Sequence, residues 1–453
     1  MMGNQADQPA FLYDFALDKH VPADHMLRSI DRFVELDEMR AKLAPFYSTT
    51  GRPSIDPELL IRMLLVGYCY GIRSERRLCE EVHLNLAYRW FCRLGLDGAV
   101  PEHSTFSKNR HGRFRDSDLF RQVFETVVRR AIKEGLVGGE GFAVDASLIA
   151  ADANKQRSVA SSEQPDWQAL AATRRSVQEY LDTLECAAWG SASEVTPKFI
   201  ATSDPAAQWT GAHKGHAFFA YSTNYLIDLK ASIIMDVEPT RAIRQAEVGS
   251  ARTMLDRVDE RFGITPVRLA ADSAYGSGEM LDWIVNKKHI APHIPVFDHS
   301  QRDDNTFSRS DFSYDPEGDV YTCPAGKRLT TRGTVVNNGT TILYRASKYD
   351  CSACPLKPRC CPKEPVRKVP RSIHEAARDV ARDIAKTDAY VESRRERKKV
   401  EMLFAHLKRI LRIRRLRLRG PCGARDEFIL AAIAQNLRKL AKLIPMPQPA
   451  MAA

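Results

Sequence analysis

The sequence lacks the features that would place a protein across a membrane. No apolar run reaches the roughly 18–20 residues that a membrane span needs. The most apolar stretch, LLIRMLLVGYCYGI, is shorter than that and contains Arg62. The first residues, MMGNQADQPAF, are polar and carry no secretory signal. We therefore expect a soluble, cytoplasmic protein with no membrane partner.

The sequence shows no internal repeat, and its excess of basic residues is confined to one stretch. The chain has 453 residues, 44% of them hydrophobic, which suffices for a sizeable core and more than one domain. Residues 394–419 hold twelve Arg or Lys and two Glu, a net charge of +10 that equals the formal charge of the whole chain. A basic excess confined to one stretch indicates a polyanionic partner, most often nucleic acid. A solvated helix face is the alternative.

Residues 28–134 are predicted to be all-helical. Apolar residues recur at helical spacing over 56–71, and a further helix is expected at 86–94. Ser74 and Ser104 are candidate caps of two more helices, the second of them basic. Short helices with tight turns are typical of a helix-turn-helix-like DNA reader, and a plain helical bundle is the alternative.

From residue 141 the hydrophobic period changes to one that predicts an α/β core with a mixed sheet. Strands are expected in GFAVDASLIAA, in VRLAADSAYG and as a pair over 217–238. Helices are expected at 246–263, where Gly263 ends the pattern, and at 279–288, 371–387, 390–412 and 428–444. Residues 155–210 show a helical middle but no strand signal, and we interpret them as an insertion. Residues 293–370 are predicted to be irregular, which is unusual unless something organises them.

Two expected strands stop at an aspartate, Asp145 in GFAVDAS and Asp272 in LAADSAYG. Ligands of sheet enzymes bind just beyond the carboxyl ends of strands, so both acids are well placed for chemistry. A turn cap is the alternative for either residue.

A third acid, Glu401, lies in the basic helix. At about 100° per residue, Arg397, Glu401 and Lys408 fall within about 40° of one another and form a polar stripe. The stripe borders an apolar face, so we expect Glu401 to reach the sheet edge. An i,i+4 ion pair with Arg397 is the alternative.

These motifs resemble bacterial insertion-sequence transposases of the DDE class. Many of them carry the last carboxylate in a Tyr-x2-Arg-x3-Glu-x6-Lys signature, which Arg397, Glu401 and Lys408 fit. Arg394 stands where the signature has Tyr. The stretches GRPSIDPELLIRMLLVGYCYGIRSERRL, AVDAS and LAADSAYGSGEML also resemble the family, in the same order, over roughly 30–440.

The resemblance implies a ribonuclease H-like catalytic core whose mixed sheet is flanked by helices. It implies that Asp145, Asp272 and Glu401 are catalytic and hold Mg²⁺, as two ions, or Mn²⁺. Hard carboxylate oxygens suit such ions, which stabilise charge on attacking and leaving oxygens. The residues expected to contact DNA are Arg394, Arg397, Lys408, Arg414, Arg415, Arg417 and Arg419. The partners would be double-stranded DNA, as terminal inverted repeats and target, and further copies of the chain in a homodimer or larger complex.

Five of the ten cysteines cluster between Cys323 and Cys361. In an intracellular protein such clustering favours metal over disulfides. The Cys351–Cys354 pair beside the CPAG turn of Cys323 resembles half of a zinc ribbon. Zn²⁺ bound by Cys323, Cys351, Cys354 and either Cys360 or Cys361 would organise the irregular segment. Free or redox-active thiols are the alternative.

We expect four units: a helical DNA-binding domain at 28–134, the first part of the core at 135–292, a Cys-rich insertion at 293–387 and the core's C-terminal helices at 388–444. The predicted function is DNA transposition by a mobile element's enzyme, through cleavage and strand transfer. A metal-dependent nuclease without joining activity and a catalytically inert DNA-binding repressor are the alternatives.

Overall fold

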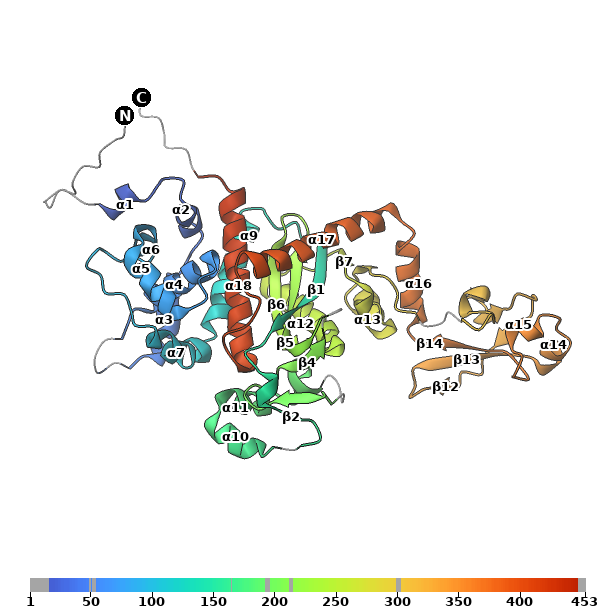
Figure 1. Ribbon diagram of the computed structural model, residues 1–453. Helices are drawn as coiled ribbons and strands as arrows, with labels where there is room; N and C mark the ends of the chain where they lie inside the picture. Colours follow the sequence, from blue (N-terminus) through green and yellow to red (C-terminus); the bar gives the residue numbers. More distant parts are fainter. Residues whose placement is uncertain are drawn as a thin grey trace, which may run out of the picture.

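The computed structural model describes residues 16–48, 50, 54–163, 165–191, 196–211, 215–298 and 303–446. The polar start of the chain and the first residues of the GRPSID stretch lie outside this range. Figure 1 shows a helical region, a central sheet with its covering helices, and a second sheet at the opposite end of the molecule. Within the described residues, no helix is both long and apolar enough to span a membrane.

The amino-terminal region is helical, as predicted. Asp56 caps the helix that begins at Pro57, and Ser74 caps the next. The predicted cap at Ser104 is wrong, because Ser104 is already the first helical residue and its hydroxyl bonds Glu102. The helices are α1 (Leu17–His20), α2 (Met26–Asp31), α3 (Met39–Leu43), α4 (Pro57–Tyr70), α5 (Glu75–Leu84), α6 (Leu86–Phe91), α7 (Ser104–Arg110), α8 (Arg113–Asp116) and α9 (Leu119–Lys133).

The central sheet is mixed, as predicted. Its order is β6-β5-β1-β7-β8, and the short β4 also pairs with β5. Strand β5 is antiparallel to both of its neighbours, β1 and β6, whereas β7 and β8 run parallel to β1. The strands are β1 (Gly141–Ala150), β4 (Gln208–Gly211), β5 (Ala217–Asp228), β6 (Ile233–Arg241), β7 (Arg268–Ala270) and β8 (Ala291–His293).

Helices cover both faces of this sheet. Tyr225 of β5 stacks on Phe404 of α17 (Asp388–Arg409) and donates a hydrogen bond to Gln435 of α18 (Gly420–Leu443). Ser222, three residues earlier, faces the other side and bonds Glu247 of α12 (Arg244–Phe262). Helix α12 ends at Gly263, whose φ of 64° is the left-handed conformation that glycine adopts readily. Helix α13 (Gly278–Asp282) follows β7.

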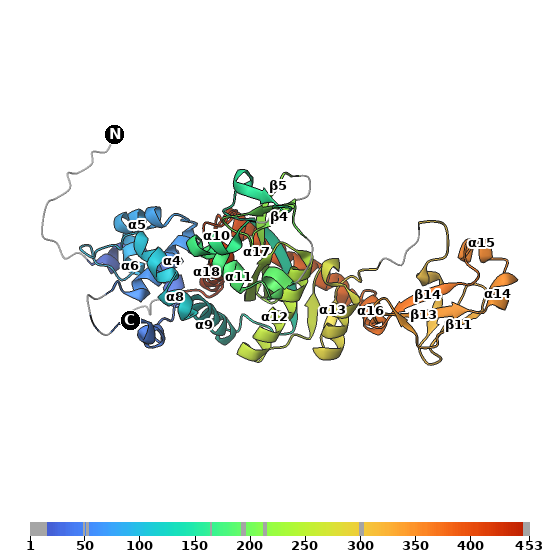
Figure 2. The same cartoon turned by 90° about the horizontal axis from the view of Figure 1, so that it is seen from below.

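The insertion at 155–210 contains helices and short strands. Helices α10 (Trp167–Thr173) and α11 (Arg175–Asp182) match the predicted helical middle. The expectation of no strand is wrong, since β2 (Ser158–Ala160) pairs with β3 (Phe199–Ala201) and β4 joins the central sheet. These strands have three or four residues each, too few for an alternating pattern to be visible. Helix α11 contacts α18, and Figure 2 shows these two helices together.

The segment predicted to be irregular forms a second six-stranded sheet, so that prediction is wrong. Its small core contains Phe312, Tyr321, Leu329, Tyr344 and Val369. Most of its strands are only two or three residues long, which hides them from pattern analysis. They are β9 (Ser313–Asp315), β10 (Val320–Thr322), β11 (Arg328–Thr330), β12 (Val335–Val336), β13 (Thr341–Ala346) and β14 (Lys368–Ser372), with helices α14 (Lys348–Ser352), α15 (Lys357–Cys360) and α16 (Glu375–Ile384) nearby.

Buried acids attach the insertion to α18. Asp204, fully buried between β3 and β4, accepts a hydrogen bond from Tyr221. Burial raises the pKa of Asp204 to about 7, although Tyr221 and the backbone N–H of Gly420 lower it. Burial also raises the pKa of Asp426, on α18, to about 7. The folded state therefore holds protons that an unfolded carboxyl, with a pKa near 3.9, would release.

This proton uptake predicts a pH dependence of stability. Between about pH 4 and 7 these two carboxyls bind more protons in the folded state than in the unfolded state, so their contribution to the free energy of unfolding should decrease as pH rises. Asp204→Asn should make the free energy of unfolding fall less steeply with pH, by up to about 1.4 kcal/mol per pH unit. The contribution of Asp426 to the slope should remain. Urea denaturation at pH 5, 6, 7 and 8 measures this. The exposed Asp97→Asn is the control, and an Asp204→Asn profile parallel to the wild type would contradict the prediction.

Candidate active site and nucleic-acid interface

Asp145 and Asp272 occupy equivalent positions beside two neighbouring parallel strands. The last residue pair of the β1–β7 ladder is Ala143 with Ala270, and each aspartate follows its alanine by two residues. The expectation that Asp145 ends its strand is wrong, because β5 continues to pair with β1 as far as Ala150. Only β7 stops, which leaves one edge of β1 open next to Asp145.

Helix α17 brings Glu401 to this open edge. The Arg397 guanidinium contacts a carboxylate oxygen of Asp145 at 3.2 Å and one of Glu401 at 3.4 Å. The Asp145 side chain is 18% exposed and that of Glu401 is 55% exposed. The i,i+4 ion pair is therefore present, but Arg397 also links Glu401 to Asp145. Glu401 lies at the solvent rim of the acid cluster.

The acids affect one another electrostatically. Burial raises the pKa of Asp145 to about 6. The Ala146 N–H and Arg397 lower this pKa, and the negative charges of Asp272 and Glu401 raise it. Within the described ranges, no group of three or more His, Cys, Asp or Glu side chains is arranged to hold a metal ion. In this arrangement the Arg397 guanidinium is the cation that offsets the charge of Asp145 and Glu401.

Two further residues lie at this cluster and were missed from the sequence. Glu247 approaches from the α12 face, where burial raises its pKa, the Ser222 hydroxyl lowers it and the charge of Asp272 raises it. Tyr275 is buried, and its hydroxyl has no hydrogen-bond partner in the described part of the chain. Burial raises the pKa of Tyr275, and the neighbouring carboxylates add to this. The sequence offered one indication of Glu247: Ser222 is a polar residue inside a buried strand, and such a residue needs a polar partner from a neighbouring element.

Lys408 and the basic segment, defined as residues 412–419, continue along the same edge of β1. Lys408 Nζ donates to Ser147 Oγ at 2.8 Å, two residues beyond Asp145, and burial lowers its pKa. Ala150 donates to the Arg414 carbonyl and accepts from the Leu416 N–H, so the basic segment docks beside the end of β1. Ile413 and Leu416 are buried. The exposed arginines of the segment are Arg412, Arg414, Arg415, Arg417 and Arg419.

The predicted DNA-binding arginines differ in their partners. Arg415 and Arg419 both pair with Asp152, at 2.9 and 2.8 Å. Arg414 donates to the carbonyl of Lys408 at 3.3 Å and forms no ion pair within the residues that the structure describes. Arg394 is exposed on α17, whereas Arg397 is engaged with the acids. The structure thus places Arg397 at Asp145 and Glu401, and Lys408 at Ser147, two residues from Asp145.

The five clustered cysteines line one small cavity at the second sheet. The turn after Cys323 is held by the Lys327 N–H, which donates to the Cys323 sulfur at 3.3 Å. Burial raises the pKa of Cys361, and the nearby Cys351 raises it further. All five are free thiols. The predicted zinc ligands, Cys323, Cys351, Cys354 and Cys360, are therefore neighbours in space.

Comparison with known families identifies two parts of the chain. Residues 15–112 match a family described as a transposase domain (DUF772), and residues 322–441 match one described as a transposase DDE domain. The chain is an insertion-sequence transposase of the DDE family. The second match includes Glu401 and the basic segment, whereas Asp145 and Asp272 lie outside both matched ranges.

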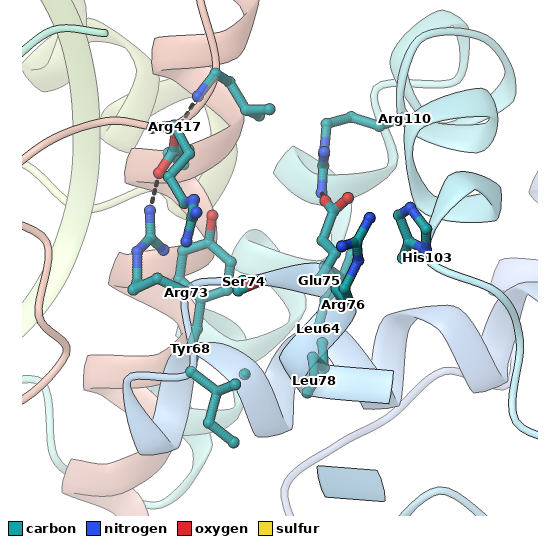
Figure 3. A pocket seen from close by; sticks show the side chains of 14 residues that line it. Leu64, Tyr68, Arg73, Ser74, Glu75, Arg76, Leu78, His103, Arg110 and Arg417 are labelled. Atoms are coloured by element: carbon teal, nitrogen blue, oxygen red, sulfur yellow. Dashed lines mark hydrogen bonds and ion pairs between the residues drawn. The ribbon is translucent and has the colours of Figure 1, made fainter. Parts of the chain in front are cut away.

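In this transposase a buried carboxylate, Glu427 of α18, joins the helical region to the basic segment. Glu427 is 1% exposed, pairs with Arg73 and accepts the backbone N–H groups of Arg417 and Leu418. Figure 3 shows the cavity of about 410 Å³ beside this junction, with Arg73 and the backbone of Arg417 bonded to the same carboxylate. Arg110 and Glu75 form an ion pair on the cavity's other side.

Removing Glu427 should destabilise the transposase strongly. Glu427→Ala leaves Arg73 buried without its partner and two backbone N–H groups without an acceptor. We expect a loss of about 3–5 kcal/mol in the free energy of unfolding, measured by urea denaturation. The control is Glu81→Ala, which breaks a more exposed i,i+4 pair with Arg77 and should cost at most about 1 kcal/mol. Equal losses in the two variants would contradict the prediction.

Proposed function

We propose that this transposase binds the terminal inverted repeats of a mobile element and performs metal-dependent cleavage and strand transfer on a ribonuclease H-like core. The sheet order β6-β5-β1-β7-β8, with three antiparallel strands followed by two parallel ones, supports the core assignment. The proposed units are 28–134, 135–292, 293–387 and 388–444.

The observation that supports the proposal is that Asp272 and Glu401 both lie near enough to Asp145, at the open edge of β1, to act on its charge. Asp145 and Asp272 follow the last parallel pair by two residues each, and Arg397 links Glu401 to Asp145. Their hard oxygen donors fit Mg²⁺ or Mn²⁺. When bound there, two such ions would stabilise charge on the attacking and leaving oxygens of an in-line displacement.

The residues around the acids supply positive charge for DNA. Arg397 contacts Asp145, and Lys408 lies near the same edge of β1. We expect the DNA backbone to follow the further basic surface formed by Arg394, Arg414, Arg415, Arg417 and Arg419. We assign these residues to phosphate contacts and the sequence preference to the amino-terminal helices.

The proposed reaction needs no covalent enzyme intermediate. Water attacks phosphorus, and the bond to the 3′-oxygen breaks, which leaves a 5′-phosphate and a free 3′-hydroxyl. That hydroxyl then attacks a phosphorus of the target, the target's own bond to its 3′-oxygen breaks, and the released target strand leaves with a 3′-hydroxyl. Each chain carries one set of acids and an element has two ends. We therefore infer that a homodimer or larger complex acts on the DNA.

The acids provide the direct test. Asp145→Asn, Asp272→Asn and Glu401→Gln should each abolish cleavage of terminal-repeat duplex in Mg²⁺, because each removes a carboxylate from the proposed ion site. DNA affinity should change little, since none of them is a cationic contact. Gel assays of cleavage, joining and binding measure these effects, and the joining assay separates a transposase from a nuclease.

The matched control is Glu392→Gln, an exposed acid on the same helix. This variant should cleave like the wild type. If any one of the three acid variants keeps wild-type cleavage, that residue does not belong to the active site.

We further propose that the second sheet holds a structural Zn²⁺ through Cys323, Cys351, Cys354 and either Cys360 or Cys361. The support is their arrangement around one cavity and the backbone N–H that orients the Cys323 sulfur. Thiolate ligands would fix strands of two to six residues that have only a small apolar core of their own.

Metal analysis tests this proposal. Transposase purified without chelators should contain about one zinc per chain, with sulfur ligands about 2.3 Å from the metal by X-ray absorption. Cys351→Ser/Cys354→Ser should lose the zinc, and the exposed Cys186→Ser should retain it. Wild-type protein free of zinc would refute the assignment.

A further inference from the structure

A second basic cavity lies where the insertion meets the end of the basic segment. It has a volume of about 490 Å³ and is lined by Arg157, Arg174, Arg175 and Arg419. Hydroxyl side chains of Thr173, Ser176, Thr202 and Ser203 complete the described lining, which contains no acidic residue. The insertion provides every one of these residues except Arg419.

The arginines of this cavity carry more positive charge than their partners neutralise. Arg175 pairs with Glu179, but Glu179 also pairs with Arg115. Asp152 is likewise shared between Arg419 and Arg415. Arg174 donates only to the carbonyl oxygen of Thr202, at 2.7 Å.

Arg157 is the least engaged of the four. Its guanidinium makes no hydrogen bond or ion pair with any residue in the described ranges, and the residue is exposed. Two full charges, those of Arg157 and Arg174, therefore face the cavity without a carboxylate.

The walls of the cavity are fixed in place. Ser176 donates to the Ser203 carbonyl at 2.6 Å, which ties α11 to the chain after β3. Glu179 accepts from the backbone N–H of Cys422 at 3.3 Å, which ties α11 to the first turn of α18. A site whose groups are held by such contacts loses little freedom when a ligand binds.

We infer that this cavity binds backbone phosphates of duplex DNA away from the cut, an inference that rests on the proposed function. Arginine forks and hydroxyl donors suit phosphate oxygens. The cavity continues the basic segment, because Arg419 lines it while Arg415 shares Asp152 with Arg419.

The position of the contact can be bounded from the chain. Asp152 follows Asp145 by seven residues, most of them in β1. An extended chain rises about 3.3 Å per residue, so Asp152, which pairs with Arg419 of the cavity, lies on the order of 20 Å from Asp145. With about 3.4 Å per base pair, this distance places the contacted phosphates roughly six base pairs from the cleaved bond.

The test compares two double variants of the full-length protein. Arg157→Ala/Arg174→Ala removes the two unneutralised charges of the cavity. Arg328→Ala/Arg345→Ala removes two exposed arginines of the second sheet as the control. Dissociation constants for terminal-repeat duplex are measured across a KCl series, with Arg414→Ala/Arg417→Ala reporting on the basic segment.

The cavity variant should lower the slope of log affinity against log salt by up to about 1.8, since each lost phosphate contact accounts for about 0.9. The control should keep the wild-type slope. Neutral methylphosphonates placed one at a time should weaken wild-type binding at a position roughly six base pairs from the cut. The cavity variant should be insensitive at that position.

The other outcomes overturn the inference in distinct ways. A cavity variant that matches the control in slope and methylphosphonate profile refutes it, and so does a loss confined to single-stranded RNA. If the double variant fails to fold, Arg157→Ala alone should still lower the slope by about 0.9. Wild-type protein that binds no duplex DNA at any salt refutes the proposed function instead.

Discussion

The architecture of the site depends on how the edge of one strand is shared. Along one side of β1, the first three residues pair with β7 and the last, Ala150, pairs with the basic segment. The residues between them, 144–149, have no strand neighbour on that side in the described chain, and α17 packs there instead. Since side chains alternate along a strand, Asp145 and Ser147 share one face, and they meet Arg397 and Lys408 of α17. Acidic and basic side chains therefore lie along one edge of β1.

Charge balance explains why so basic a helix contains an acid. Burial and neighbouring carboxylates make ionised Asp145 costly, and Arg397 offsets that cost by contacting Asp145 and Glu401 together. The same arginine therefore serves the acids in the DNA-free protein and adds to the basic surface around them. A residue of the opposite sign at position 401 would remove this link and leave Arg397 with Asp145 alone.

The sequence was sufficient where an element was long or carried a strong local signal. The helical period placed Glu401 on the stripe beside the buried face, and Gly263 marked the end of α12. The sequence was insufficient where the length or position of a strand depends on the strand with which it pairs. Strand β1 extends past Asp145 because β5 pairs with its whole length, and the strands of the second sheet are too short to show alternation. Glu247 was hidden for a related reason: its role depends on Asp272, which is near only after the sheet forms.

Helix α18 connects the parts of the transposase that we assign to DNA. Its first turn is held by Glu179 and Asp204 of the insertion, and its Glu427 binds Arg73 of the helical region and the backbone of the basic segment. It also packs on β6 and α9. Because these contacts are buried ion pairs and hydrogen bonds, moving one part relative to another would expose unpaired charge at a cost of several kcal/mol. The helical region, the basic segment and the arginine cavity therefore all contact the same helix, α18. Their spacing on DNA is then set by the fold of this chain rather than by the flexibility of linkers.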